Sequence, residues 1–244
     1  MEEKQILTLE NLYYSINGFE LAADFQVPRG SKVAVIGPSG SGKSTLLSLI
    51  AGFVSPNKGK VIIDNHDVSE QKPNERYVTS IFQDGNLFPH LTVEQNIGLG
   101  ISPSLKLNDS QLEILNKAIV RVGLSGFAKR SPGTLSGGQQ SRVSLARSLV
   151  RDHPILLLDE PFSALGPSLK SDMLNLVNEI ADEKKLTLLF VSHEPQDVRK
   201  ICNLSIVVGD GCAFPPIETR ELFKNPPKVL KAVSYTHLTL PTKA

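Results

Sequence analysis

The pattern of apolar and polar positions divides most of the chain into short strands and helices. Runs rich in Val, Ile and Leu have the length of buried strands, and polar or glycine-rich turns bound them. These runs cover residues 32–36, 61–63, 78–82, 154–158 and 186–192. Helical patterns lie between several of them. Such an alternation favours an α/β fold with a largely parallel sheet.

Two helices are predicted beside these strands. One covers residues 43–51, and Gly52 follows where a glycine commonly ends a helix. In the other, apolar residues recur at intervals of three and four, so we expect them to face the core. These residues are Leu169, Met173, Leu176, Val177 and Ile180.

The middle third of the chain, residues 88–151, has almost no strand signal. Asn108 and Gln111 have the spacing of a capping box at the start of a helix. An apolar stripe follows that start, made by Leu112, Leu115, Ile119 and Val122. A second helix is predicted over residues 137–150. We interpret this region as a helical subdomain inserted into the α/β core.

Composition narrows the class of protein. The chain of 244 residues is 40% hydrophobic and 21% charged, as expected of a globular protein with a sizeable core. Its net charge of +1 argues against a nucleic-acid partner. The two cysteines are too few for a disulfide framework. No apolar stretch reaches the roughly 18 residues that cross a bilayer, and the first residues lack the pattern of a signal peptide. We therefore expect a cytoplasmic protein that reaches a membrane only through a partner.

A phosphate-binding loop is predicted between the first strand and the first helix. The segment Gly37-Pro38-Ser39-Gly40-Ser41-Gly42-Lys43-Ser44, followed by Thr45, fits the pattern G-x-x-x-x-G-K-[ST]. Glycines let the backbone N–H groups approach phosphate oxygens, and the helix adds its positive N-terminal end. Lys43 is expected to neutralise the β- and γ-phosphates, and the Ser44 hydroxyl to ligate Mg²⁺. A glycine-rich turn with an exposed lysine is the structural alternative.

Two carboxylates, Asp159 and Glu160, follow an apolar strand. Ligands of open α/β sheets bind at the carboxyl ends of the strands. Neighbouring residues on a strand point to opposite sides, so we expect the two carboxylates to have different tasks. Asp159 suits Mg²⁺, and Glu160 suits the activation of the water that attacks the γ-phosphate. Without the phosphate loop, a solvated acidic turn would be the simpler interpretation.

A second glycine segment, Leu135-Ser136-Gly137-Gly138-Gln139, opens the second helix of the middle region. Its two glycines allow the backbone to approach an anion, and Ser136 adds a donor. The structural alternative is an ordinary helix start with Ser136 as the N-cap. This pentapeptide is the most specific signal in the sequence.

With these motifs the chain resembles the ATP-binding cassette (ABC) ATPases over about residues 7–223. The resemblance implies that Tyr14 stacks on adenine, with Tyr13 as the alternative and a core aromatic as the structural one. It also implies that Gln83 senses Mg²⁺, contributes to hydrolysis and meets the membrane partner, and that His193 contacts the γ-phosphate. The other four histidines of the chain show no metal-binding spacing and are not assigned a role.

The resemblance also implies a fold and an assembly. We expect a P-loop NTPase core at about residues 1–87 and 152–233, with a parallel-rich sheet and an antiparallel β part near the N-terminus. The helical subdomain would cover about residues 88–151, and residues 234–244 would be an unstructured or foreign tail. Two cassettes of this family associate head to tail, so that each ATP lies between the phosphate loop of one copy and the Ser136–Gln139 segment of the other.

One position departs from the family pattern. Gly166 ends the segment Ser163-Ala164-Leu165-Gly166, where the family usually has an aspartate. That carboxylate helps to connect the two nucleotide sites of the dimer. We therefore expect slower or less cooperative hydrolysis, and a catalytically weak regulatory subunit is the alternative.

The single cassette, without a long insertion, favours the energy subunit of a bacterial importer. The resemblance implies separate transmembrane permease subunits, an extracytoplasmic substrate-binding protein, and a peripheral position on the cytoplasmic face of the inner membrane. Residues 86–108 and the short C-terminal region look most like the ATPase of thiamine importers. Cassettes for iron, phosphonate or lipoprotein extraction are the alternatives, because the cassette itself does not touch the transported molecule.

Overall fold

A computed structural model describes residues 4–82 and 87–231 of the chain. Within these residues the strands form one mixed sheet in the order β5-β4-β1-β2-β10-β9-β3-β8-β7-β6, and β11 pairs with β9. In chain order the strands are β1 (Gln5–Ile16), β2 (Phe19–Pro28), β3 (Lys32–Ile36), β4 (Lys58–Ile63), β5 (His66–Asp67), β6 (Val78–Phe82), β7 (Ile155–Asp159), β8 (Thr187–Val191), β9 (Leu204–Gly209), β10 (Cys212–Ala213) and β11 (Ile217–Glu218).

The parallel part of the sheet consists of β6, β7, β8, β3 and β9, and it confirms the prediction of parallel strands. Leu157 on β7 pairs with Ser80 on β6 and with Leu189 on β8. Strand β3 then pairs in parallel with β8 on one side and β9 on the other. The four predicted runs of this region match β3, β6, β7 and β8 to within one residue at each end. Strand β9 was not predicted.

The parallel strands are buried on both faces, because their alternate side chains enter two separate cores. On β3, Ala34 and Ile36 belong to the core under the helices α4 (Gly137–Leu149) and α5 (Pro167–Lys184), whereas Val33 and Val35 belong to the core around α1 (Lys43–Ala51). This burial explains why these strands are uninterrupted apolar runs. It also fixes the carboxyl ends of β3, β7 and β8 side by side, where the predicted motifs follow them.

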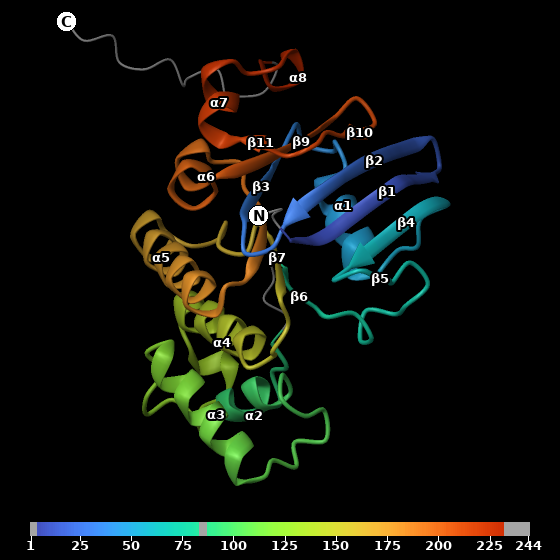
Figure 1. The fold of residues 1–244 in the computed structure, drawn as a ribbon. Helices are drawn as coiled ribbons and strands as arrows, with labels where there is room; N and C mark the ends of the chain where they lie inside the picture. Colours follow the sequence, from blue (N-terminus) through green and yellow to red (C-terminus); the bar gives the residue numbers. More distant parts are fainter. Residues whose placement is uncertain (1–3, 83–86, 232–244) are drawn as a thin grey trace, which may run out of the picture.

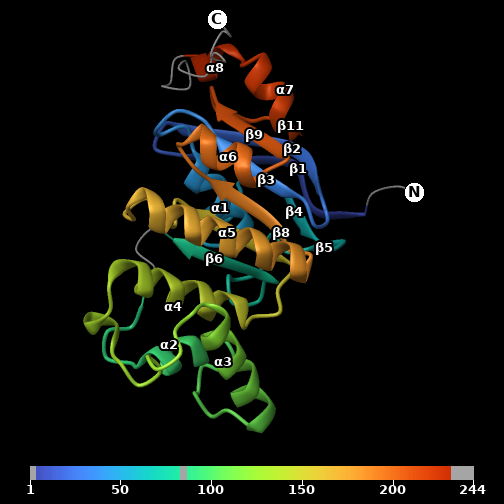
Figure 2. The ribbon, with the colours of Figure 1, turned by 90° about the vertical axis from the view of Figure 1, so that its left-hand side faces the viewer.

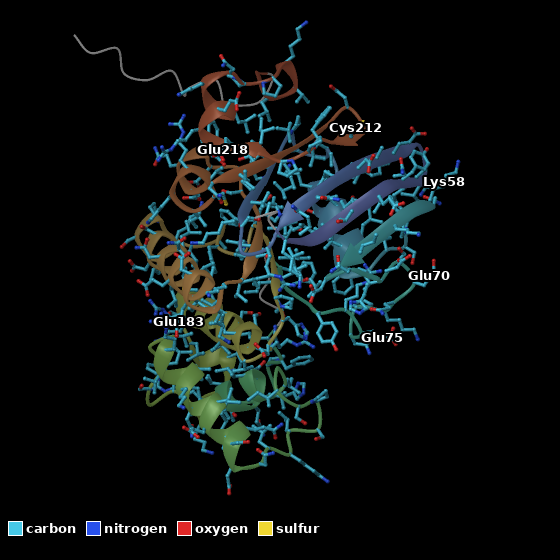
Figure 3. The ribbon with its side chains drawn as sticks, in the orientation of Figure 1. Lys58, Glu70, Glu75, Glu183, Cys212 and Glu218 are labelled. Atoms are coloured by element: carbon cyan, nitrogen blue, oxygen red, sulfur yellow. The ribbon has the colours of Figure 1, made fainter. Side chains whose placement is uncertain are left out.

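The antiparallel part confirms the expectation for the N-terminal region. Strands β1 and β2 form a hairpin, and β1 also pairs antiparallel with β4, which pairs with β5. Figure 1 shows α1 enclosed between these strands and the parallel part of the sheet. The charged side chains of Lys58, Glu70 and Glu75 project outward at this side of the molecule (Figure 3).

The helices of the described residues lie around the sheet and at both ends of the molecule (Figures 1 and 2). They are α1 (Lys43–Ala51), α2 (Val93–Gly98), α3 (Asp109–Arg121), α4 (Gly137–Leu149), α5 (Pro167–Lys184), α6 (Pro195–Ile201), α7 (Thr219–Lys224) and α8 (Lys228–Lys231), with a 3-10 turn at Pro132–Thr134. Helices α2, α3 and α4 lie together at one end of the molecule, and α5 lies across the parallel strands (Figures 1 and 2).

The helical region agrees with its sequence pattern in most details. Between residues 87 and 151 the described chain contains helices and turns and no strand. Asn108 and Gln111 form the predicted capping box of α3, and Gly52 ends α1 with a φ of 83°. The division into subdomains stays a prediction, and residues 234–244 lie outside the described residues.

One predicted core position is wrong. Leu169 on α5 is 43% exposed, although the other members of its stripe are buried or packed against the core. Leu112, in the apolar stripe of α3, is 42% exposed. Both lie in the first turn of their helix. The Leu169 side chain lies against Gly138 at the start of α4.

Candidate functional site

The predicted phosphate loop connects the end of β3 to the start of α1. Gly40 and Gly42 have φ values of 76° and 104°, which L side chains rarely adopt. Gly42 is also needed for space, because a Cβ there would lie 2.8 Å from Cζ of Phe19. The sequence predicted these glycines but not Phe19, which is the aromatic side chain in contact with the loop.

Lys43 folds back into the loop that precedes it. Its Nζ donates hydrogen bonds to the carbonyl oxygens of Gly37 at 3.0 Å and Pro38 at 2.8 Å, and only 6% of the residue is exposed. Burial lowers the pKa of Lys43, while the charges of Glu160 and Asp159 oppose that shift. A bound anion would compensate the same ammonium group for its lost hydration.

The start of α1 is open for an anion. Its N-cap residue, Gly42, offers no side chain to the first N–H groups, and the first turn contains no acidic residue. Within the described residues the buried Oγ of Ser41 has no hydrogen-bond partner. Ser39, Gly40 and Ser44 are exposed along the same segment. Unsatisfied donors beside a buried ammonium group fit a polyphosphate.

Asp159, the last residue of β7, lies beside the start of α1. It accepts a hydrogen bond from the side chain of Ser44, as expected if both residues serve one site. Burial raises the pKa of the Asp159 carboxyl, and the Ser44 hydrogen bond and the Lys43 charge only partly oppose it. A hydroxyl and a carboxylate oxygen are ligands that Mg²⁺ accepts beside phosphate oxygens and water, so this pair fits the ion.

Glu160 turns away from Asp159 because its backbone leaves the strand conformation. Its φ of 48° lies in the left-handed region, which is strained for a residue with a side chain. Its Oε1 lies 2.5 Å from Nε2 of His193, the second residue after β8. The two predicted catalytic groups are therefore in direct contact, and both are partly exposed. The acidic pair therefore has two different partners, Ser44 for Asp159 and His193 for Glu160. Their different tasks stay a prediction.

The second glycine segment lies at the start of α4 and forms a complete helix cap. The Ser136 hydroxyl accepts from the Gln139 N–H at 3.3 Å, and Gln139 Oε1 accepts from the Ser136 N–H at 3.0 Å. Ser136 and Gly137 are exposed. Gly138 is buried, and a Cβ there would lie 3.3 Å from the Leu169 side chain. The start of α5 thus packs on the start of α4.

This segment does not join the phosphate loop of its own chain in the described contacts. It lines a cleft of about 370 Å³ whose opposite wall includes Pro161, Phe162 and Leu165, from the segment after β7. The other described groups of the site, Lys43, Asp159, Glu160 and His193, meet at the carboxyl ends of β3, β7 and β8.

The roles of two predicted residues, Tyr14 and Gln83, stay untested. Tyr14 lies on β1 with 9% of its surface exposed and belongs to the core around α1, while Tyr13 is half-buried. Stacking on adenine stays a prediction. Gln83 lies outside the described residues, so its role also stays a prediction.

Sequence reasoning missed the polar residues that lie near His193. Lys170 on α5 forms ion pairs with Glu194 and Asp197, which flank the histidine on its C-terminal side. The available signal was weak, because a lysine in a helix is usually a solvated residue.

Comparisons with known proteins show the family of the chain. Residues 22–163 match the family described as ABC transporter. The "Thiamine import ATP-binding protein ThiQ" of Cereibacter sphaeroides is 50% identical over 227 residues, which is 93% of this chain and 98% of that protein. The protein of the same name from Ruegeria sp. is 50% identical over 93% of this chain and 98% of its own length. The one from Shigella flexneri is 49% identical over 84% of this chain and 89% of its own length.

Solved structures give the same result for the fold. The structure of cbiO1 from Clostridium perfringens, described as part of the ABC transporter complex cbiONQ, superposes with a TM-score of 0.81 at 28% identity. It covers 91% of this chain and 92% of that one. An ATP-binding cassette of an ABC transporter, solved in its ADP conformation, gives a TM-score of 0.80 at 28% identity, over 93% of this chain and 98% of that one.

Proposed function

The chain belongs to the ABC transporter family, and from this premise we propose that it is the energy-coupling subunit of a bacterial thiamine importer. As a member it binds ATP and is an ATPase coupled to transport. The substrate assignment is supported by relatives named for thiamine import that are about half identical over nearly their whole length. Thiamine and its phosphates are the proposed cargo. Iron, phosphonate and lipoprotein remain the alternatives to be tested.

One observation carries the proposal of hydrolysis, namely the contact of Glu160 with His193 beside the phosphate loop. Glu160 would accept a proton from the attacking water, and His193 would orient Glu160 and contact the γ-phosphate. Lys43 would offset the charge of the β- and γ-phosphates. Mg²⁺, held by Ser44 and Asp159, would neutralise charge on the phosphate oxygens.

The site requires a second copy of the chain. Ser136 and Gly137 are exposed, and Gly137 lines a cleft whose described walls contain no residue of the phosphate loop of its own chain. In a head-to-tail homodimer the exposed glycine segment of one copy would cover the nucleotide on the other. ATP then favours association, because it contacts both copies and so binds the dimer more tightly than a single copy. Hydrolysis removes that difference in affinity.

The remaining partners are proposed from the family. Permease subunits in the membrane would bind this chain near Gln83, and a substrate-binding protein would deliver thiamine to them from outside. In the described part of the chain, no helix combines the length and apolarity of a membrane span. We place the protein on the cytoplasmic face of the inner membrane as a peripheral subunit.

The enzymatic part is tested with purified protein. Wild-type protein is expected to hydrolyse ATP, and the Glu160→Gln variant to bind ATP without turnover. Lys43→Ala is expected to lose ATP binding, because it removes the buried ammonium group. ATP binding by wild-type protein without turnover, even with its permease, would instead identify a regulatory subunit.

The substrate is tested in membrane vesicles that contain the permease and the binding protein. Wild-type protein should support ATP-dependent uptake of labelled thiamine, and the Glu160→Gln variant should not. Excess unlabelled thiamine should compete, whereas iron or a phosphonate should not. ATP-dependent uptake of iron or phosphonate without thiamine uptake would overturn the substrate assignment.

A further inference from the structure

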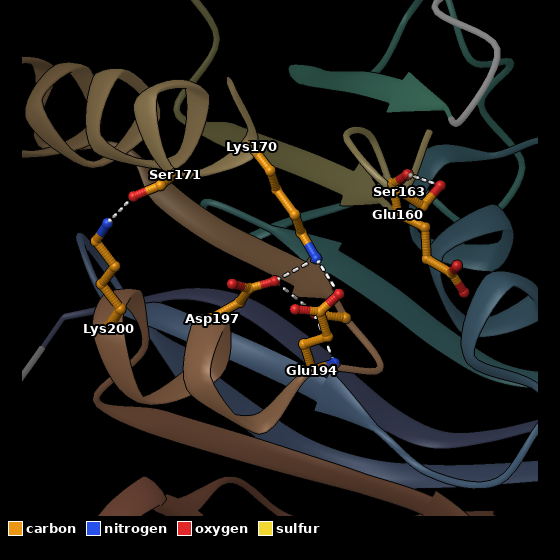
Figure 4. A network of polar contacts seen from close by, with 8 residues as sticks. Glu160, Ser163, Lys170, Ser171, Glu194, Asp197 and Lys200 are labelled. Atoms are coloured by element: carbon orange, nitrogen blue, oxygen red, sulfur yellow. Dashed lines mark hydrogen bonds and ion pairs between the residues drawn. The ribbon is translucent and has the colours of Figure 1, made fainter. Parts of the chain in front are cut away.

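Lys170 is a nearly buried cation close to the catalytic pair. It lies in the first turn of α5, and its side chain is 15% exposed. Its Nζ lies 2.6 Å from Oδ2 of Asp197 and 2.7 Å from Oε1 of Glu194 (Figure 4). Burial lowers the pKa of Lys170, but the hydrogen bonds and charges of Asp197 and Glu194 outweigh it and raise that pKa. The ammonium group is therefore held in its charged form.

The partners of Lys170 connect the residues on both sides of His193. Asp197 accepts a hydrogen bond from the hydroxyl of Ser192 at 3.4 Å. The same hydroxyl accepts from the N–H of Glu194 at 3.1 Å. Ser192 and Glu194 are the residues before and after His193. A chain of polar contacts thus runs from α5 to the segment that carries the histidine.

Close packing does not hold the histidine in place. The His193 side chain is 41% exposed, and a cavity of about 160 Å³ lies beside it. Its walls include Glu160, Lys170, Ser192 and Glu194. Because core packing leaves space here, the polar contacts have to set the position of the ring relative to Glu160.

We propose that Lys170 is a positioning residue for ATP hydrolysis, acting through Glu194, Asp197 and Ser192 to hold His193 against Glu160. This inference rests on the proposed function. Lys170 also lies one helical turn after the residue that departs from the family pattern, and its N–H makes the first backbone hydrogen bond of α5, to the carbonyl of Gly166 at 2.9 Å. The first turn of α5 therefore has Gly166, which is expected at the dimer contact, at its start and Lys170 at its end.

The test compares Lys170→Met with Lys170→Arg and a matched control. Lys200 is the control, because it also joins α6 to α5, through Ser171 Oγ at 2.9 Å, but is exposed and is not linked to His193 by any of the described contacts (Figure 4). Lys170→Met is expected to lower kcat about tenfold or more, since small displacements of a catalytic group have effects of this size. The KM for ATP should change less than about twofold, because phosphate binding is left intact. Lys170→Arg should recover most of kcat, and Lys200→Met should behave as wild type.

A double variant tests whether Lys170 acts through the histidine. In a His193→Ala background, Lys170→Met should lower kcat no further, because the positioned group is already absent. Asp197→Asn supplies a second variant of unchanged size if Lys170→Met fails to fold, and it should give the same loss of kcat. Wild-type kcat in Lys170→Met or Asp197→Asn, or a further loss in the His193→Ala background, would overturn the inference. Absence of hydrolysis by the wild-type protein would instead overturn the proposed function, and this inference with it.

Discussion

At the scale of single residues, the site contains charges that the fold stabilises poorly without a ligand. Burial disfavours the ammonium group of Lys43 and the carboxylate of Asp159. Both groups have partners, but the pKa of Lys43 is still lowered and the pKa of Asp159 is still raised, so each shift favours the neutral form. The sequence identified both residues by motif. Their energetic cost depends on burial, which a motif does not contain.

Replacing Asp159 with asparagine should stabilise the protein. The raised pKa means that the folded state binds more protons than the unfolded state between the ordinary aspartate pKa and the raised value. The free energy of unfolding from this group therefore falls as pH rises through that window, and it stays lower above it. Asp159→Asn should raise the free energy of unfolding at pH 7 in urea titrations while ATP hydrolysis falls.

Asp172, an exposed aspartate on α5, supplies the control for this experiment. Asp172→Asn should leave the free energy of unfolding within about 0.5 kcal/mol of wild type. A less stable Asp159→Asn variant at pH 7 would show that Ser44 and Lys43 outweigh burial at Asp159.

Gly166→Asp should restore coupling without disturbing the fold. Gly166 has φ −62° and ψ 156° at the N-cap of α5, and nothing lies within 4 Å of the position of an added Cβ. Aspartate is a favourable N-cap, so stability should stay the same or rise by a few tenths of a kcal/mol. The rate or the cooperativity of ATP hydrolysis should rise about fivefold, the lower end of ordinary coupling between sites. Unchanged kinetics in a folded variant would contradict the role given to this position.

At the scale of elements, the orientation of α1 depends on an arginine far along the chain. Arg76 is 1% exposed. Its guanidinium donates to the carbonyls of Leu49 and Ile50 at the end of α1, at 2.7 and 2.9 Å, and to Ser69 and Gln71. These bonds satisfy carbonyls that a helix end leaves unpaired. Arg76 therefore fixes the helix whose other end carries the phosphate loop.

Arg76→Met should lower the free energy of unfolding by about 3 kcal/mol, because several buried carbonyls lose their donors. Arg130 is the control, since it is exposed and its guanidinium lies 4.6 Å above the Phe127 ring. Arg130→Met should cost less than about 1 kcal/mol. Equal losses in both variants, measured by urea unfolding, would show that the buried contacts of Arg76 contribute no special stability.

Among the helices and strands, those with strong local sequence patterns could be predicted. Strands β3, β6, β7 and β8 and helices α1, α3 and α4 follow from local patterns, because their periodicity and caps are determined by nearby residues. Strand β9 and the contact of Leu169 with Gly138 depend on tertiary packing between distant segments. Phe19 and Lys170 belong to the same class, since their partners are identified only once the sheet is assembled.

At the scale of the whole molecule, the fold separates the phosphate loop from the second glycine segment. The phosphate loop lies beside α1, at the carboxyl end of the parallel strands, and the Ser136–Gln139 segment starts α4 in the helical region (Figure 2). Two separate cores, one under α4 and α5 and one around α1, support these two surfaces. This separation is the reason for proposing that two chains share two ATP molecules.

The most direct measurement of this claim is the mass of the Glu160→Gln variant by light scattering with saturating ATP and Mg²⁺, in the presence of its permease subunits where needed. The account predicts a complex that contains two copies of the chain with ATP and separates when ATP is removed. Adding Ser136→Glu should abolish the ATP-dependent pairing while ATP binding through Lys43 persists, because the new charge would face the γ-phosphate. A single copy of the chain at saturating ATP, with nucleotide bound, would contradict the account.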